Sequence, residues 1–181
     1  MSHTFALTRR PLARHTALAH LASLSADSFE GYASLFGVAD GAGDVVEPGA
    51  FAASLRRRGP SEIRMLWQHF AHEPIGAWET IREDGRGLYV RGRLTGLVQR
   101  ATEARALIAA GAVNGLSIGF RTRRAVRDAR GGTRRLLEIE LWEVSVVTFP
   151  LLTGSTVTAI GTEHAAASHI RAAASRMANG E

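Results

Sequence analysis

Neither cysteine nor lysine occurs in this chain of 181 residues. The lack of cysteine excludes disulfide bonds, thiolate metal sites and a cysteine nucleophile. Because lysine is absent, all 22 basic residues are arginines, and the formal net charge is +5. The arginines lie in short, dispersed runs with no nucleic-acid-binding motif beside them, so we expect no specific nucleic-acid partner.

Long apolar runs are also missing. No segment approaches the roughly 18 consecutive apolar residues of a membrane-spanning helix. The N-terminal region contains Arg9, Arg10 and Arg14 but no continuous apolar stretch with a cleavage site, so we expect neither secretion nor a membrane partner. Apolar residues still make up 45% of the chain, which is enough for one globular domain with a sizeable core.

The composition divides the chain into three regions. Residues 1–28 are rich in Ala, Leu, Arg, Ser and His without a strand pattern, which predicts a flexible N-terminal arm. Residues 29–160 carry the patterned segments and form the predicted domain. Residues 161–181 are again rich in Ala, Ser and His, which predicts a helical or disordered tail.

The predicted domain consists mainly of short strands. Alternating or apolar segments are separated by turn-rich stretches such as 37–43, and two segments have helical spacing. The predicted strands are 29–36, 63–69, 75–82, 88–94, 112–121, 135–141 and 144–149, with a further one at 156–160; the predicted helices are 48–56 and 98–110. Such a series of about seven strands predicts a mainly antiparallel α+β fold, with the sheet curled into a barrel or sandwich and the helices outside.

Ser117 is the candidate nucleophile. With a period of two, Ser117 faces away from the side of the strand that Leu116 and Ile118 share. Gly115 and Gly119 leave the backbone on either side open to close approach, as an extended substrate would require. The alternative is an ordinary solvent-facing serine.

The string Gly-Leu-Ser-Ile-Gly also fits the nucleophile elbow of α/β-hydrolases. That elbow needs a strand before the serine and a helix after it. Here the order is reversed, because the predicted helix 98–110 precedes Ser117 and a strand follows it. The flanking pattern therefore disfavours an α/β-hydrolase.

Two of the seven histidines lie in the predicted domain. His69 ends a predicted strand, and we regard it as the candidate base; the alternative is a strand-end histidine bonded to backbone. His72 lies in a polar loop, and with His69 and Glu73 it raises the possibility of a metal site. The spacing of the histidines and the break at Pro74 disfavour metal binding, so we predict no metal and no cofactor.

Glu143 is the candidate acid that would orient such a base. Counting by twos places Glu143 on the same side as Leu141, whereas Glu138 and Glu140 alternate outward as solvated charges. A buried carboxylate needs a partner, and an imidazole would suit, although an arginine is an alternative. A kink at Trp142 would change this parity, and the sequence leaves that point open.

Six segments occur in an order that resembles a known family: Gly49–Phe51, Met65–His69, Pro74–Gly76, Gly87–Val90, Gly111–Phe120 and Leu141–Pro150. Together they resemble the prohead serine proteases of tailed phages of the HK97 type, including relatives in gene transfer agents. The resemblance covers roughly residues 29–160. Phe70 is a departure, since such proteases often have a polar residue after the histidine.

The resemblance implies a herpesvirus-protease-like barrel and a serine endopeptidase. Ser117 would be the nucleophile, His69 the general base and Glu143 the residue that orients His69. The enzyme would act in the cytoplasm of a bacterial host, inside the assembling procapsid, on scaffold segments, on extensions of the major capsid protein and on itself. The alternatives are a catalytically silent capsid-assembly protein and an esterase-like hydrolase. The sequence does not determine the oligomeric state, and a homo-oligomer is one of the alternatives.

Overall fold

The computed structural model describes residues 24–127 and 133–161. The described helices and strands all belong to one compact unit, Asp27–Ile160. Residues 1–23 of the predicted arm (1–28) and residues 162–181 of the predicted tail (161–181) lie outside the described residues.

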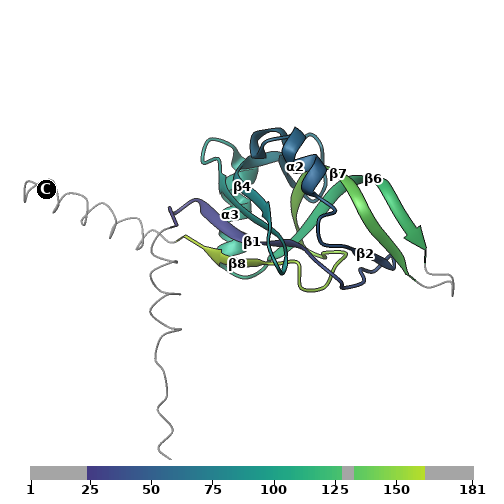
Figure 1. Ribbon diagram of the computed structural model, residues 1–181. Helices are drawn as coiled ribbons and strands as arrows, with labels where there is room; N and C mark the ends of the chain where they lie inside the picture. Colours follow the sequence, from purple (N-terminus) through teal and green to yellow (C-terminus); the bar gives the residue numbers. More distant parts are fainter. Residues whose placement is uncertain (1–23, 128–132, 162–181) are drawn as a thin grey trace, which may run out of the picture. The chain divides into compact units, whose positions relative to one another are not determined.

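The unit is built around a single eight-stranded sheet (Figure 1). Its strands are β1 (Ser28–Leu35), β2 (Asp44–Val46), β3 (Arg64–Trp67), β4 (Pro74–Glu83), β5 (Gly87–Leu94), β6 (Gly115–Arg127), β7 (Arg134–Val147) and β8 (Val157–Ile160). The strand order is β2-β7-β3-β4-β5-β1-β8, and β6 pairs with β7. Most pairs are antiparallel, whereas β2 and β3 run parallel to β7. The helices are α2 (Ala52–Arg57), the 3-10 helix η1 (Pro60–Glu62) and α3 (Gln99–Ala109).

The sheet curls until its two ends meet at the start of β6. A single bridge joins Gly115 to Thr156 just before β8. The Leu116 N–H donates to the Ser155 carbonyl at 2.8 Å, and the Val157 N–H donates to the Asn114 carbonyl at 2.8 Å. β6, β7, β3, β4, β5, β1 and β8 therefore run round a barrel, and β2 extends it beside β7. The predicted strand-rich barrel with peripheral helices is confirmed.

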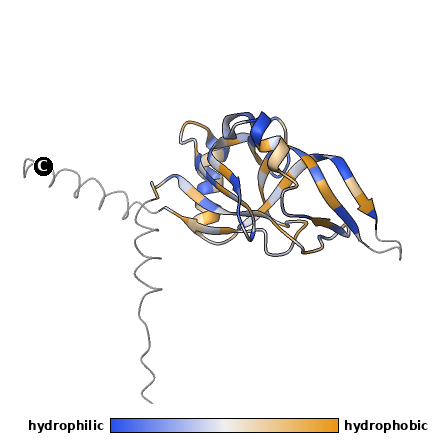
Figure 2. Cartoon of the chain, in the orientation of Figure 1, coloured by the Kyte–Doolittle hydropathy of each residue, from blue (hydrophilic) through white to orange (hydrophobic). Residues whose placement is uncertain are grey.

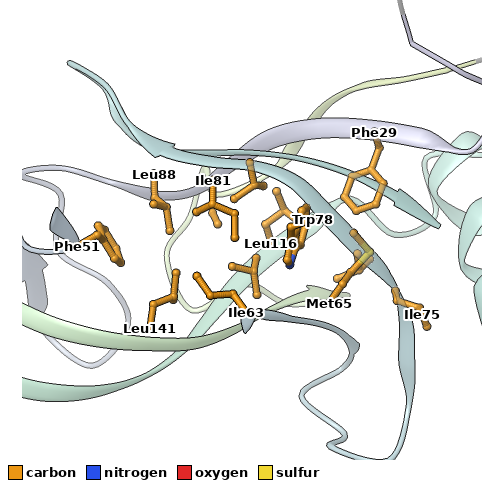
Figure 3. Close-up of a cluster of buried hydrophobic side chains, with 14 of the residues drawn as sticks. Phe29, Phe51, Ile63, Met65, Ile75, Trp78, Ile81, Leu88, Leu116 and Leu141 are labelled. Carbon is orange, nitrogen blue, oxygen red and sulfur yellow. The ribbon is translucent and has the colours of Figure 1, made fainter. Parts of the chain in front are cut away.

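Apolar side chains fill the inside of this barrel (Figure 3). Phe29 and Trp78 meet edge to face with their ring centroids 5.5 Å apart, and Leu116 and Leu141 are fully buried. Each fully buried side chain of this size stabilises the fold by roughly 1.5–3 kcal/mol. Polar and apolar residues follow one another along the strands, as the mixed colours of the ribbons show (Figure 2).

A β-bulge in β7 changes which residues face the core. Gly119 pairs with Glu143 but Phe120 pairs with Leu141, which leaves Trp142 without a partner on β6. Leu141 and Val144 are both fully buried although they are three positions apart, so the alternation switches at the bulge. The prediction that Glu143 shares the side of Leu141 was wrong, because Glu143 lies on the opposite face. Segments 135–141 and 144–149 were predicted as separate strands, but residues 134–147 form the one strand β7.

Candidate active site

The turn between β3 and β4 presents His69. β3 ends at Trp67, two residues before the predicted end, and Gln68 and His69 both have positive φ values of 52° and 63°. Such backbone costs roughly 1–2 kcal/mol per residue outside glycine, so contacts must hold it. The Gln68 N–H donates to the Val146 carbonyl at 3.0 Å, and the Gln68 side chain donates to the Thr148 hydroxyl at 2.8 Å. These bonds fix the turn, and with it His69, against the end of β7.

The His69 ring contacts the carboxylate of Glu143. The distance from His69 Nδ1 to Glu143 Oε1 is 2.6 Å, and the two side chains are 44% and 13% exposed. The hydrogen bond to Glu143 raises the pKa of His69, burial partly opposes this, and the negative charge of Glu143 adds to the increase. Because Nδ1 is occupied by Glu143, Nε2 is the ring nitrogen left to accept a proton.

Ser145 holds both partners of this pair and was not among the predicted site residues. Its hydroxyl is fully buried, donates to Glu143 Oε2 at 2.7 Å and accepts the His69 N–H at 3.1 Å. Both oxygens of the Glu143 carboxylate are therefore engaged. The signal in the sequence was the spacing of two from Glu143, which puts both side chains on one face of a strand.

Ser117 lies on β6 beside this cluster. It pairs directly with Ser145, and Gly119 pairs with Glu143. Residues paired across antiparallel strands share a face, and their Cα atoms lie about 4.5–5.5 Å apart. The half-buried Ser117 therefore faces outward next to the residue that accepts the His69 N–H. Within the described ranges, no hydrogen bond joins the Ser117 and His69 side chains, and such bonds are often long in unliganded enzymes.

The chain itself fills the space beside the two glycines that flank Ser117. A Cβ atom on Gly119 would lie 2.1 Å from Glu143 Oε1, and one on Gly115 would lie 2.6 Å from the Val147 carbonyl oxygen. The expectation that these glycines leave open backbone for a substrate was therefore wrong. They allow parts of β7 to approach β6.

An arginine partner was the alternative considered for Glu143, but the structure shows arginine partners at Glu140 instead. Glu140 is bound by Arg58 at 3.2 Å and by Arg123, and its side chain is only 12% exposed. Its predicted role as an ordinary solvated charge was wrong. In the part of the chain that the structure describes, no arginine forms an ion pair with Glu143.

His72 and Glu73, which with His69 formed the disfavoured metal alternative, have other neighbours. Glu73 forms an ion pair with Arg100 at 3.3 Å, and the His72 ring lies 5.6 Å from the Phe70 ring. Among the described residues, no group of three or more His, Cys, Asp or Glu side chains is arranged to hold a metal ion.

None of the described helices has the length and apolar character needed to cross a membrane.

Ser117 also lines a pocket of about 40 Å³, together with Leu116, Ile118 and Phe120 of β6. Its walls come from β1, β2, the loop between these two strands, β6 and the segment after β7, and they are mostly apolar. They include Val46, Phe120 and Leu152. The site therefore combines a hydroxyl, an imidazole bound to a carboxylate, and a small apolar recess.

Solved structures with this fold include two viral proteases. The KSHV protease in complex with a hexapeptide phosphonate inhibitor matches with a TM-score of 0.52 and 12% identity, over 72% of this chain and 63% of that one. The capsid assembly protease of bacteriophage T4 matches with a TM-score of 0.55 and 15% identity, over 66% of this chain and 80% of that one. At these identities the likeness establishes the fold, which is that of the herpesvirus and phage assembly proteases.

The sequence defines the family. The profile of the caudovirus prohead serine proteases matches residues 17–170, and the chain belongs to this family, as predicted. It is 39% identical over 124 residues to the prohead protease of Enterobacteria phage HK97, covering 67% of this chain and 55% of that protein. It is 34% identical over 123 residues to the capsid polyprotein of Pseudomonas phage PAJU2, covering 65% of this chain and 18% of the polyprotein. The chain thus spans about half the length of the first relative and under a fifth of the second.

Proposed function

We propose that this chain is a serine endopeptidase of capsid maturation. It cleaves scaffold segments, extensions of the major capsid protein and itself, inside the procapsid that assembles in the host cell. The observation that carries the proposal is the 2.6 Å contact of His69 with Glu143 beside Ser117, on the strand pair where Ser117 lies opposite Ser145. Membership of the prohead protease family and the names of the two phage relatives support the choice of substrate.

In the first step, the Ser117 oxygen attacks the carbonyl carbon of the peptide bond that is cleaved. His69 Nε2 takes the hydroxyl proton as the new C–O bond forms, and Glu143 stabilises the imidazolium through Nδ1. The tetrahedral intermediate then collapses, and the C–N bond breaks as His69 gives its proton to the leaving amine. The product is an acyl-enzyme on Ser117.

In the second step, water completes the reaction. His69 removes a proton from the water as its oxygen attacks the acyl carbon, and the same proton returns to the Ser117 oxygen when that bond breaks. Serine and histidine are therefore regenerated and one peptide bond is hydrolysed. The apolar recess beside Ser117 receives an apolar side chain of the substrate next to the cleaved bond.

Co-expression with the major capsid protein of the same particle tests this function. The parent chain should shorten the capsid protein on a gel, whereas Ser117→Ala should reduce the rate by roughly 10³-fold or more. Ser61→Ala is the matched control, because it changes an exposed serine of η1 outside the site and should leave the rate unchanged. Cleavage by Ser117→Ala at the parent rate would refute the proposal.

Labelling with a fluorophosphonate probe and a comparison of peptide and ester substrates together distinguish the proposed protease from the two alternatives. A reactive serine endopeptidase is labelled at Ser117 and prefers a peptide over a small ester of similar structure. A catalytically silent capsid-assembly protein would not be labelled. Preference for the ester would identify an esterase-like hydrolase.

A further inference from the structure

Gly119 lies where a side chain would collide with Glu143. A Cβ atom built on Gly119 would be 2.1 Å from Glu143 Oε1 and 2.7 Å from both Cδ and Cγ. Cβ atoms in real structures essentially never make non-bonded contacts this short, and the three nearest atoms all belong to Glu143. The carboxylate therefore occupies the space that any other residue at position 119 would fill.

The atom that meets this space is the one that contacts His69. Glu143 Oε1 lies 2.6 Å from His69 Nδ1, and the other oxygen accepts the Ser145 hydroxyl at 2.7 Å. Because Glu143 pairs with Gly119 across the strands, the carboxylate folds back over the β6 backbone on the outward face. The bare Cα of Gly119 is what allows this direction.

We propose that Gly119 is a positioning residue, whose missing side chain gives Glu143 the space to reach His69. The inference builds on the proposed protease, but it concerns the placement of the carboxylate and not the bond that is cleaved. Gly119 has no positive φ, so an alanine fits the strand backbone and only the side-chain collision distinguishes the two residues. Since the colliding atoms are the end of a flexible side chain, Gly119→Ala folds and Glu143 rotates away.

Titration of His69 by NMR measures this displacement without any turnover. In the parent, Glu143 supplies both the hydrogen bond and the negative charge that raise the pKa of His69. In Gly119→Ala the pKa of His69 should fall toward its ordinary value of about 6.5. Gly96→Ala is the matched control, because a Cβ atom there meets nothing within 4 Å, and it should keep the parent titration.

The same variants have distinct kinetic expectations. The kcat/KM of Gly119→Ala should fall by roughly 10²-fold, as for other misplacements of about 1 Å in an active site. The loss should approach that of Glu143→Ala, whereas Gly96→Ala retains the parent value. A parent-like His69 titration together with parent-like kcat/KM in Gly119→Ala would overturn the proposal.

A double-mutant cycle covers the case in which Gly119→Ala folds poorly. Glu143→Ala removes all three colliding atoms, so adding Gly119→Ala to it should leave the melting temperature unchanged. An equal loss of stability in both backgrounds would show that the collision is not with Glu143 and would refute the inference. Neither this cycle nor the titration needs activity, so both remain decisive even if Ser117→Ala shows that the chain is not a protease.

Discussion

Two glutamates three positions apart on β7 have opposite partners. Glu140 is neutralised by Arg58 and Arg123, whereas Glu143 contacts a histidine and a serine. An arginine would hold its charge at any ordinary pH, but a histidine gains and loses a proton near neutrality. Of the two carboxylates, Glu143 therefore has the partner that suits proton transfer.

The raised pKa of His69 predicts the acid side of the pH profile. The general base must be neutral, so kcat/KM should rise with pH and reach half its plateau above the ordinary histidine value of about 6.5. Glu143→Gln removes the charge that favours the protonated ring and should shift this midpoint to lower pH. Superimposable profiles of the parent and Glu143→Gln would contradict the assignment.

The raised pKa of His69 also predicts how the free energy of unfolding changes with pH. A pKa raised by folding means that the folded state binds the proton more tightly, so the contribution of His69 is fully present below about pH 6.5. It is lost as the pH rises through the raised value. Denaturant titrations of the parent and of Glu143→Gln should therefore differ most in the acidic range.

At the residue scale, the sequence was informative about chemical type but not about contacts. Ser117, His69 and Glu143 were selected because a nucleophile, a base and an acid lay in recognisable segments. The contacts of Ser145 and Gly119 with Glu143 were not predicted, because these contacts depend on the register between β6 and β7. No local pattern in either strand specifies which residues lie opposite one another.

At the scale of elements, the turn after β3 is the part under strain. Gln68 and His69 both adopt left-handed backbone, and the Gln68 amide is bonded to Thr148 at 2.8 Å through Nε2 and at 3.3 Å through Oε1. The sequence predicted a strand through His69, because a strand pattern carries no sign of a change in φ. The turn is fixed by the end of β7, which is distant in the sequence.

Gln68→Ala should therefore loosen His69 while leaving the barrel intact. Both bonds to Thr148 are lost, and kcat/KM should fall by roughly 10- to 100-fold because the imidazole is less well placed. The control is Gln99→Ala on α3, an exposed glutamine whose amide is bonded to Glu103 at 2.9 Å. Steady-state kinetics should separate the two variants, and equal kcat/KM values would show that the Gln68 side chain does not position His69.

The β-bulge at Trp142 is a second structural feature that the sequence did not specify. The sequence suggested a kink but could not give its parity, and a shift of one residue moves every following side chain to the other face. With the bulge, Val144 and Val146 stay in the core while Glu143 and Ser145 lie on the opposite face of β7. One inserted residue thus places the acid on the same face as Ser117.

At the scale of the whole molecule, closure of the barrel supports the start of β6. Thr156 bridges to Gly115 on β6, and its carbonyl accepts the Tyr32 N–H of β1 at 3.1 Å. The strand-rich barrel could be predicted from segment lengths and turn residues, but β2 was not predicted, and two predicted strands belong to the single strand β7. The closure of the barrel between β6 and the start of β8 could not be predicted. It depends on one bridge, between Gly115 and Thr156, and these residues are distant in the sequence.

Gly31 controls this closure. A Cβ atom on Gly31 would lie 2.2 Å from the Thr156 carbonyl oxygen, and backbone cannot rotate away as a side chain can. Gly31→Ala should therefore push Thr156 off β1 and destabilise the unit by about 1–3 kcal/mol, a typical cost of overpacking. Calorimetry should show a melting temperature several degrees below that of Gly85→Ala, where a Cβ atom meets nothing within 4 Å. Because Ser117 lies two residues after Gly115, which bridges to Thr156, Gly31→Ala should also reduce kcat/KM. Equal melting temperatures for Gly31→Ala and Gly85→Ala would mean that the contact of Gly31 with Thr156 does not hold the barrel closed.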